Sequence, residues 1–302
     1  MKKFIILLTA FLIASCGDKK EENGKLKVVT TTTMITDLVE NIGGDLIEIN
    51  GLMGSGIDPH LYKASQGDFR KLDRADVIFY NGLHLEGKLV EVFEKMNEQA
   101  KTTIAISDGV EENTLIGSAY FASNYDPHIW FDLGYWNEIT VYVTKRLSEL
   151  DPENTKAFEA NRDVYLKKLK QLRIDLDKKV EELPKEKRIL VTAHDAFNYY
   201  GRTFDFKVVG LQGISTATEA GVKDVQRITQ FIIDRNIKAV FIESSVPRRT
   251  VEALQAAVNA QDHDVKIGGE LFSDALGSAG TEEGTYIGMY KHNVNTIVNA
   301  LK

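Results

Sequence analysis

The sequence contains a single cysteine and only five prolines in 302 residues. One cysteine cannot form a disulfide within the chain, so the folded part must be held together by its hydrophobic core. The 37 basic residues are dispersed among 44 acidic ones, and the net charge is −7. Because there is no basic stripe, the chain lacks the electrostatic footprint of a nucleic-acid-binding protein, and we expect no nucleic acid as a partner.

Long apolar runs are also scarce, and the clearest one lies at the amino terminus. Residues 4–13 are apolar but too few to cross a membrane as a helix, and Lys2 and Lys3 precede them. Small residues then lead to Cys16, an arrangement that resembles a bacterial lipoprotein signal. This predicts a signal peptide over residues 1–15 and a lipid on Cys16 that anchors an extracytoplasmic protein to the membrane. An ordinary secretory signal with an incidental cysteine is the alternative.

The rest of the chain begins with a charged segment that has no apolar residue to bury, which predicts a flexible tether over residues 16–24. Beyond it, short apolar runs alternate with amphipathic stretches, a pattern typical of parallel sheets covered by helices. Early helices are expected at residues 34–42, 65–74 and 85–96. The expected strands cover residues 25–31, 46–53, 76–80, 102–107, 188–192, 206–211, 239–243 and 265–271.

A long amphipathic stretch separates the two groups of strands. Apolar residues recur at helical spacing over residues 154–183, with Asp151-Pro152 as a start signal and Pro184 as a stop. A coiled-coil arm is the competing interpretation, but no heptad is sustained. We therefore predict an α/β fold of two small βα lobes, residues 25–150 and 185–302, each with a roughly four-stranded parallel sheet. One rigid helix, residues 151–184, bridges them and limits hinge bending.

Two of the five prolines directly precede a histidine, in Asp58-Pro59-His60 and Asp126-Pro127-His128. Proline restricts its own backbone and that of the preceding residue, so each histidine is held on a stiff, non-helical corner. His194 and Asp274 also follow expected strands, and open α/β sheets bind ligands at the carboxyl ends of their strands. Three imidazoles and one carboxylate suit Zn²⁺ and, less selectively, Mn²⁺ or Fe²⁺. We predict a metal site in the cleft between the lobes.

The motifs around these residues resemble those of one family over essentially the whole mature chain. They are Gly56-Ile57-Asp58-Pro59-His60, Asp126-Pro127-His128-Ile129-Trp130, Thr192-Ala193-His194-Asp195-Ala196-Phe197 and Leu271-Phe272-Ser273-Asp274. The family comprises the metal-binding lipoproteins of zinc and manganese ABC importers (cluster A-I, the TroA/ZnuA-like solute-binding proteins). The resemblance implies metal ligands at His60, His128, His194 and Asp274, a monomer, and an ABC permease with its ATPase as partners. It also implies two lobes bridged by a long helix, and no catalytic residue.

Two features bear on which metal is bound, and a third, at residues 219–221, is expected to alter a loop rather than the site. Residues 111–125 contain no histidine, whereas many zinc-specific relatives carry a histidine-rich loop ahead of the second ligand. The family's usual Glu-Pro-Ser is replaced by Glu219-Ala220-Gly221. The third ligand position holds His194, where manganese-type relatives often have glutamate. Because an imidazole in place of a hard carboxylate shifts preference towards zinc, we expect Zn²⁺ first and Mn²⁺ second.

Two other functions compete with metal delivery: a zinc-dependent hydrolase and a surface adhesin with structural zinc. Four protein ligands fill a tetrahedral shell, whereas a catalytic zinc keeps one position open, and no His-Glu-x-x-His signature is present. Glu219 and Glu243 are conceivable bases, but Glu243 ends an apolar strand and is better interpreted as a partner that orients a ligand imidazole. Since bound imidazoles must be neutral, metal affinity is predicted to fall below about pH 6. The other histidines (His84, His263 and His292) are interpreted as surface or structural residues.

Overall fold

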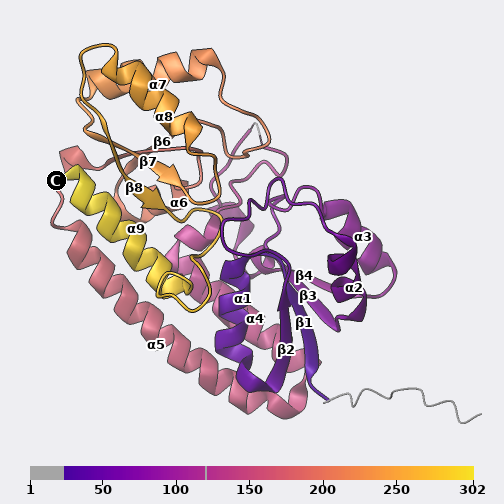
Figure 1. Ribbon diagram of the computed structural model, residues 1–302. Coiled ribbons are helices and arrows are strands. Elements are labelled where there is room, and N and C mark those ends of the chain that lie inside the picture. Colours follow the sequence, from indigo (N-terminus) through magenta and orange to yellow (C-terminus); the bar gives the residue numbers. More distant parts are fainter. Residues whose placement is uncertain (1–23, 120) are drawn as a thin grey trace, which may run out of the picture.

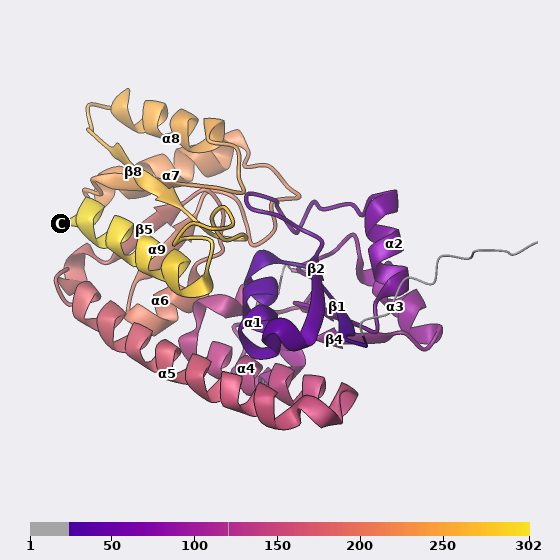
Figure 2. The same cartoon turned by 60° about the horizontal axis from the view of Figure 1, so that its bottom comes forward.

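The computed structural model describes residues 24–119 and 121–302, which form two α/β lobes. One long helix, α5 (Thr155–Val180), runs along both lobes (Figures 1 and 2). The predicted signal peptide (residues 1–15), Cys16 and all but the last residue of the predicted tether lie outside the described residues. Within the described part of the chain, no helix is both long and apolar enough to cross a membrane.

The first lobe contains a parallel sheet with the strand order β2-β1-β3-β4, which confirms the predicted four-stranded sheet. Its central strands, β1 and β3, are rich in apolar residues such as Val28, Val29, Val77 and Ile78, because both faces of the sheet are buried. Helices α1 and α4 cover one face, and α2 and α3 cover the other (Figure 2). The strands are β1 (Leu26–Thr30), β2 (Ile47–Gly51), β3 (Val77–Tyr80) and β4 (Thr102–Ala105), and the helices are α1 (Thr33–Gly43), α2 (Gln66–Arg74), α3 (Val90–Glu98) and α4 (Leu133–Leu150).

The second lobe also has four parallel strands, but they are hydrogen-bonded as two pairs, β5-β6 and β7-β8, with β5 beside β7. A β-bulge shifts the register of β7 against β8 between Val240 and Phe241. Helices α7 and α8 pack on one side of these strands and α9 on the other (Figure 1). The strands are β5 (Ile189–Thr192), β6 (Lys207–Gly210), β7 (Ala239–Glu243) and β8 (Lys266–Leu271), and the helices are α6 (Asn198–Phe204), α7 (Val222–Asp234), α8 (Arg249–Asn259) and α9 (Tyr286–Leu301).

The bridging helix α5 is part of the largest hydrophobic core rather than a free strut. At 26 residues it is about 39 Å long, somewhat shorter than the stretch expected from the sequence. Its buried side chains pack against α1 and α4 of the first lobe and α9 of the second. They are Phe158, Tyr165, Leu169, Leu172, Leu176 and Val180. Because one continuous core links both lobes to this helix, bending between the lobes would disturb close packing.

Two helices differ from the sequence-based expectation. Helix α4 was not anticipated, although Asp132 caps it by accepting hydrogen bonds from the backbone N–H groups of Gly134 and Tyr135. The helix predicted from residue 85 begins only at Val90. Its expected first turn is instead an irregular segment, because the buried Glu86 carboxylate accepts hydrogen bonds from Thr31 Oγ1 at 2.6 Å and from the backbone N–H of Asn81 at 2.7 Å. That pairing holds the segment in a non-helical turn.

Candidate metal centre

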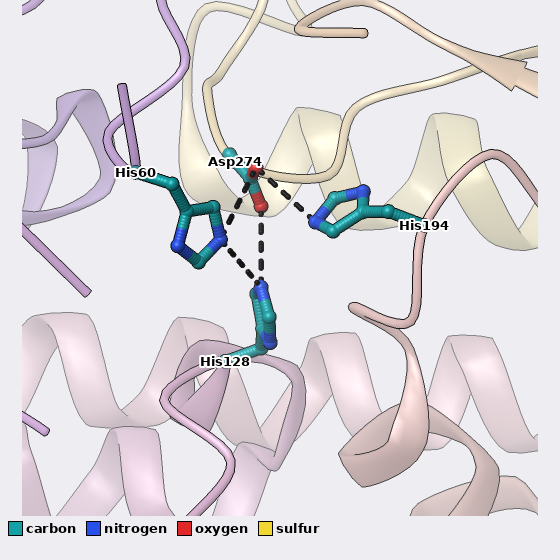
Figure 3. A group of neighbouring side chains, drawn as sticks. All are labelled: His60, His128, His194 and Asp274. Atoms are coloured by element: carbon teal, nitrogen blue, oxygen red, sulfur yellow. Dashed lines mark hydrogen bonds and ion pairs between the residues drawn. The ribbon is translucent and has the colours of Figure 1, made fainter. Parts of the chain in front are cut away.

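The four predicted ligand residues, which are far apart in the sequence, converge at one point between the lobes (Figure 3). One potential ligand atom from each of His60, His128, His194 and Asp274 lies within 4.8 Å of all the others. His60 lies in the loop after β2 and His128 in the segment that follows β4, both in the first lobe. His194 and Asp274 follow β5 and β8 of the second lobe. The site therefore draws two residues from each lobe, all of them beyond the carboxyl ends of parallel strands.

The distances around the site are close to those of a small tetrahedral ligand shell. His60 Nε2 lies 3.4 Å from His128 Nε2, and Asp274 Oδ2 lies 3.3 Å from His194 Nε2. The carboxylate is 3.6 Å from His128 Nε2 and 4.0 Å from His60 Nε2. Zinc–nitrogen bonds of about 2.0–2.1 Å separate the corners of a tetrahedron by about 3.3 Å. Of these four distances, the 4.0 Å between His60 Nε2 and the carboxylate departs most from that spacing.

Each Asp-Pro-His tripeptide forms the same turn. In the first, the backbone N–H of His60 donates to Asp58 Oδ1 at 2.9 Å. In the second, the backbone N–H of His128 donates to Asp126 Oδ1, also at 2.9 Å. Aspartate side chains commonly stabilise turns by accepting from the backbone two residues ahead, and the proline between fixes the intervening backbone. The repeated sequence thus places two imidazoles on equivalent rigid corners.

Buried carboxylates hold two of the three imidazoles from behind. His128 Nδ1 lies 2.7 Å from Asp126 Oδ1, and His194 Nδ1 lies 2.6 Å from Glu243 Oε2. Glu243 also accepts the backbone N–H of His194 at 2.9 Å. A carboxylate at Nδ1 leaves Nε2 facing the site as the electron-pair donor, an arrangement typical of metal-binding histidines. Glu243 was predicted from the sequence to orient an imidazole, whereas Asp126 was not, although it is the first residue of the repeated tripeptide.

Burial and neighbouring charges shift the pKa values of the site residues in opposite directions. Burial lowers the pKa of His60 to about 3, so this imidazole is neutral near pH 7. Burial would also lower the pKa of His194, but the charges of Glu243 and Asp274 outweigh it and hold that pKa well above its ordinary value. Burial would raise the pKa of Asp274, yet the neighbouring histidines, His194 foremost, keep it below its usual range. Without metal, His194 and Asp274 therefore form a buried ion pair.

The atoms that face the centre have few partners. All four side chains are at most 4% exposed. Among the described residues, His194 Nε2 and both carboxylate oxygens of Asp274 are buried without a hydrogen bond. Buried polar atoms that lack a hydrogen bond cost free energy, which ion pairing offsets in part and coordination of a cation would offset further. The donor set of three Nε2 atoms and one carboxylate is one that zinc accepts.

The remaining candidate residues lie apart from this group, which is the one cluster of potential metal ligands found over residues 24–119 and 121–302. His84 is exposed, as expected for a surface residue. His263 Nε2 and His292 Nε2 contact the backbone carbonyls of Ile237 and Glu270 at 2.9 and 3.0 Å. Glu219, considered as a possible base, is exposed and pairs with Arg249 at 3.5 Å.

Comparison with known proteins gives a consistent result. The family model described as ZnuA, zinc-uptake complex component A, periplasmic, matches residues 28–300. The zinc-binding protein TroA of Treponema pallidum is 46% identical over 98% of this chain and 95% of its own length. The manganese-binding lipoprotein MntA of Bacillus subtilis is 43% identical over 98% of this chain and 97% of its own. A solved structure of periplasmic zinc-binding TroA from T. pallidum superimposes with a TM-score of 0.89 at 47% identity, covering 92% of this chain and 99% of that one. The resemblance predicted from the motifs is thus confirmed, and the chain belongs to the ZnuA family of metal-uptake components.

Proposed function

We propose that His60, His128, His194 and Asp274 bind one divalent metal ion outside the cytoplasm, and that the protein delivers it to an ABC permease driven by an ATPase. The observation that carries this proposal is the buried convergence of three Nε2 atoms and one carboxylate, with three of these atom positions lacking a hydrogen bond. The metal is cargo rather than a resident cofactor. Family membership and the named binding properties of TroA and MntA support this role.

Zinc is the proposed first choice and manganese the second. One relative is named for zinc and the other for manganese, although each shares more than two-fifths of its residues with this chain. The donor set is the discriminating feature, because three imidazoles and one carboxylate suit zinc better than the oxygen-rich shells that manganese prefers. The contacts of 3.3 and 3.4 Å in the site also suit a compact, four-coordinate shell.

A zinc hydrolase is the less favoured function. A catalytic zinc uses three protein ligands and leaves a position for water or substrate, whereas four protein ligands here surround a closed, buried centre. An adhesin with structural zinc would use the same closed shell. It differs in that its metal could not be removed without loss of the fold, whereas a transport protein must release its cargo intact.

The decisive experiment uses protein stripped of metal with a chelator. Titration with Zn²⁺ is expected to show one tight site per chain, and Zn²⁺ should displace Mn²⁺ in competition. Circular dichroism of the stripped protein should show the same helix content as the loaded form. Failure to bind either ion would refute the proposal, and unfolding on metal removal would favour the structural-zinc alternative.

The anchoring of the protein is a separate proposal. Cys16 carries a lipid that holds a monomeric protein at the membrane, and the name of MntA as a lipoprotein supports this. Cys16→Ser is expected to move the protein from the membrane fraction to the soluble fraction when expressed with its full amino terminus. Fractionation of cells followed by immunoblotting measures this. Retention of the variant in membranes would show that another element anchors the chain.

A further inference from the structure

The two Asp-Pro-His corners differ in how firmly they are attached to the second lobe. The second corner, residues 126–128, is fixed from several directions. Tyr199 Oη donates to the backbone carbonyl of Asp126, and Asn198 Nδ2 donates to Asp126 Oδ2, each at 3.0 Å. Asn81 Nδ2 donates to the carbonyl of Pro127 at 3.0 Å. Asp126 and His128 are completely buried.

The segment that follows the second corner is tied to the second lobe as well. The hydroxyl groups of Tyr286 and Tyr290 on α9 donate to the carbonyls of Trp130 and Phe131, each at 2.6 Å. Trp130 Nε1 donates in turn to the carbonyl of Ser273, next to Asp274, at 3.0 Å. Releasing His128 would break this whole set of buried bonds, so this side of the site is the rigid one.

The first corner, residues 58–60, is held to the second lobe by fewer hydrogen bonds. Asp58 Oδ1 is occupied by the backbone of its own histidine, and its Oδ2 accepts a hydrogen bond from Thr216 Oγ1 at 2.5 Å. In the described residues, one other side-chain hydrogen bond joins this loop to the second lobe, from the exposed Ser55 to the carbonyl of Leu276 at 2.9 Å. Among the described residues, no carboxylate is hydrogen-bonded to Nδ1 of His60, whereas His128 and His194 each have such a partner. The position of the His60 ring therefore depends mainly on Asp58.

Thr216 belongs to a loop with space beside it. The loop, residues 211–221, connects β6 to α7 in the second lobe. It lines a cavity of about 640 Å³ whose other walls include Phe121 and Asp195. Phe121 contacts the His60 ring edge-on, with 6.4 Å between ring centroids, so one wall of the cavity packs against a residue of the metal centre. A loop that borders open space can shift without disturbing the core that joins the lobes.

We propose that the hydrogen bond between Asp58 and Thr216 positions His60 and sets the rate at which the metal leaves, an inference that rests on the proposed function. Movement of loop 211–221 towards the cavity breaks this bond and frees Asp58, so that His60 withdraws while the other three ligands stay in place. Loss of one ligand opens a position on the metal for water or for an accepting group. Thr216 is a positioning residue in this scheme, since it acts through Asp58 and does not touch the metal.

The test compares three variants in the otherwise complete, metal-loaded protein. Thr216→Val keeps the shape of the side chain but removes the donor. Thr216→Ser restores the hydroxyl, and Thr218→Val is the matched control because Thr218 is exposed in the same loop. Zn²⁺ release is followed by stopped flow into an excess of a chromogenic chelator. A hydrogen bond to a carboxylate is strong enough that its loss should speed release by about tenfold.

We expect Thr216→Val to release Zn²⁺ about tenfold faster while Thr216→Ser and Thr218→Val stay within about twofold of wild type. The rate of Zn²⁺ association should change little, because loss of the hydrogen bond between Asp58 and Thr216 acts on the metal-bound state. If Thr216→Val releases Zn²⁺ at the wild-type rate, or if Thr218→Val accelerates release equally, the proposed role of the hydrogen bond between Asp58 and Thr216 is refuted. The proposed function of the protein is not affected by either result. If the unmodified protein binds no Zn²⁺, the proposed function itself has failed, and the two failures are thereby distinguished.

Discussion

Replacing Asp274 with alanine is expected to weaken Zn²⁺ binding by about a hundredfold to a few thousandfold. Asp274 is the only anionic member of the site, and it lies completely buried among three imidazoles. Leaving a buried charge without its counter-charge typically costs about 3–5 kcal/mol, and each 1.4 kcal/mol corresponds to about a factor of ten in affinity. Calorimetric titration, or competition with a chelator of known affinity, measures the loss.

Two companion variants make this result interpretable. Asp274→Asn keeps an oxygen donor and loses the charge, so its affinity should fall between those of wild type and Asp274→Ala. Glu219→Ala removes an exposed carboxylate that is paired with Arg249, and its affinity should not change. Each metal-free variant should remain folded, although Asp274→Ala should melt at a lower temperature than the wild type because it removes one partner of the buried ion pair with His194. Tight binding by Asp274→Ala would exclude the four-residue site, and unfolding of that variant would indicate a structural role.

Zinc binding is expected to release about one proton per metal ion at neutral pH, so that affinity rises about tenfold for each unit of pH. Glu243 and Asp274 hold the pKa of His194 well above its ordinary value, and a metal can take Nε2 only after that proton leaves. Affinity is therefore lost as pH falls below the raised pKa of His194. His60 adds nothing to the slope near pH 7 because burial lowers its pKa to about 3.

Calorimetry in two buffers with different ionisation enthalpies counts the released protons directly. Glu243→Gln provides the control, because it removes a negative charge 2.6 Å from His194 Nδ1 and so lowers the pKa of that imidazole. Proton release at pH 7 should fall in this variant, while metal affinity drops by about 10–100-fold for loss of the orienting carboxylate. Affinity that is independent of pH between 6 and 8 in the wild type would rule out a protonated His194. From the sequence alone, metal affinity was predicted to decline only below about pH 6. The ion pair between His194 and Asp274 extends the expected decline to higher pH.

The ligand set is the part of the site that could be inferred without coordinates. Proline makes the turns of the two Asp-Pro-His corners a local property, because the backbone restriction acts on neighbouring residues. His194 follows an apolar strand that is recognisable from a short run of sequence, and Asp274 follows a strand of more mixed composition. In parallel α/β sheets, strand ends gather at one edge, so residues distant in the chain could be expected to meet.

Elements were mispredicted where a tertiary contact decided the local structure. Residues 85–89 have helical propensity, but the buried bonds of Glu86 to Thr31 and Asn81 hold them in a turn. Helix α4 was not predicted, although Asp132 caps it. It packs against α5, and this tertiary contact cannot be recognised from the local sequence. The separation of the second lobe's strands into two pairs depends on how β5 lies beside β7.

The sequence by itself determined the family, the α/β class, the bridging helix and the four residues that meet between the lobes, because these follow from local patterns of apolar residues, prolines and strand ends. Only the tertiary structure decided that Asp126 holds an imidazole, that Glu243 reaches both the ring and the backbone of His194, that neighbouring carboxylates raise the pKa of His194, and that Thr216 reaches Asp58. These features depend on distances of a few ångströms and on burial, which arise when segments far apart in the chain pack together, and no local spacing encodes them.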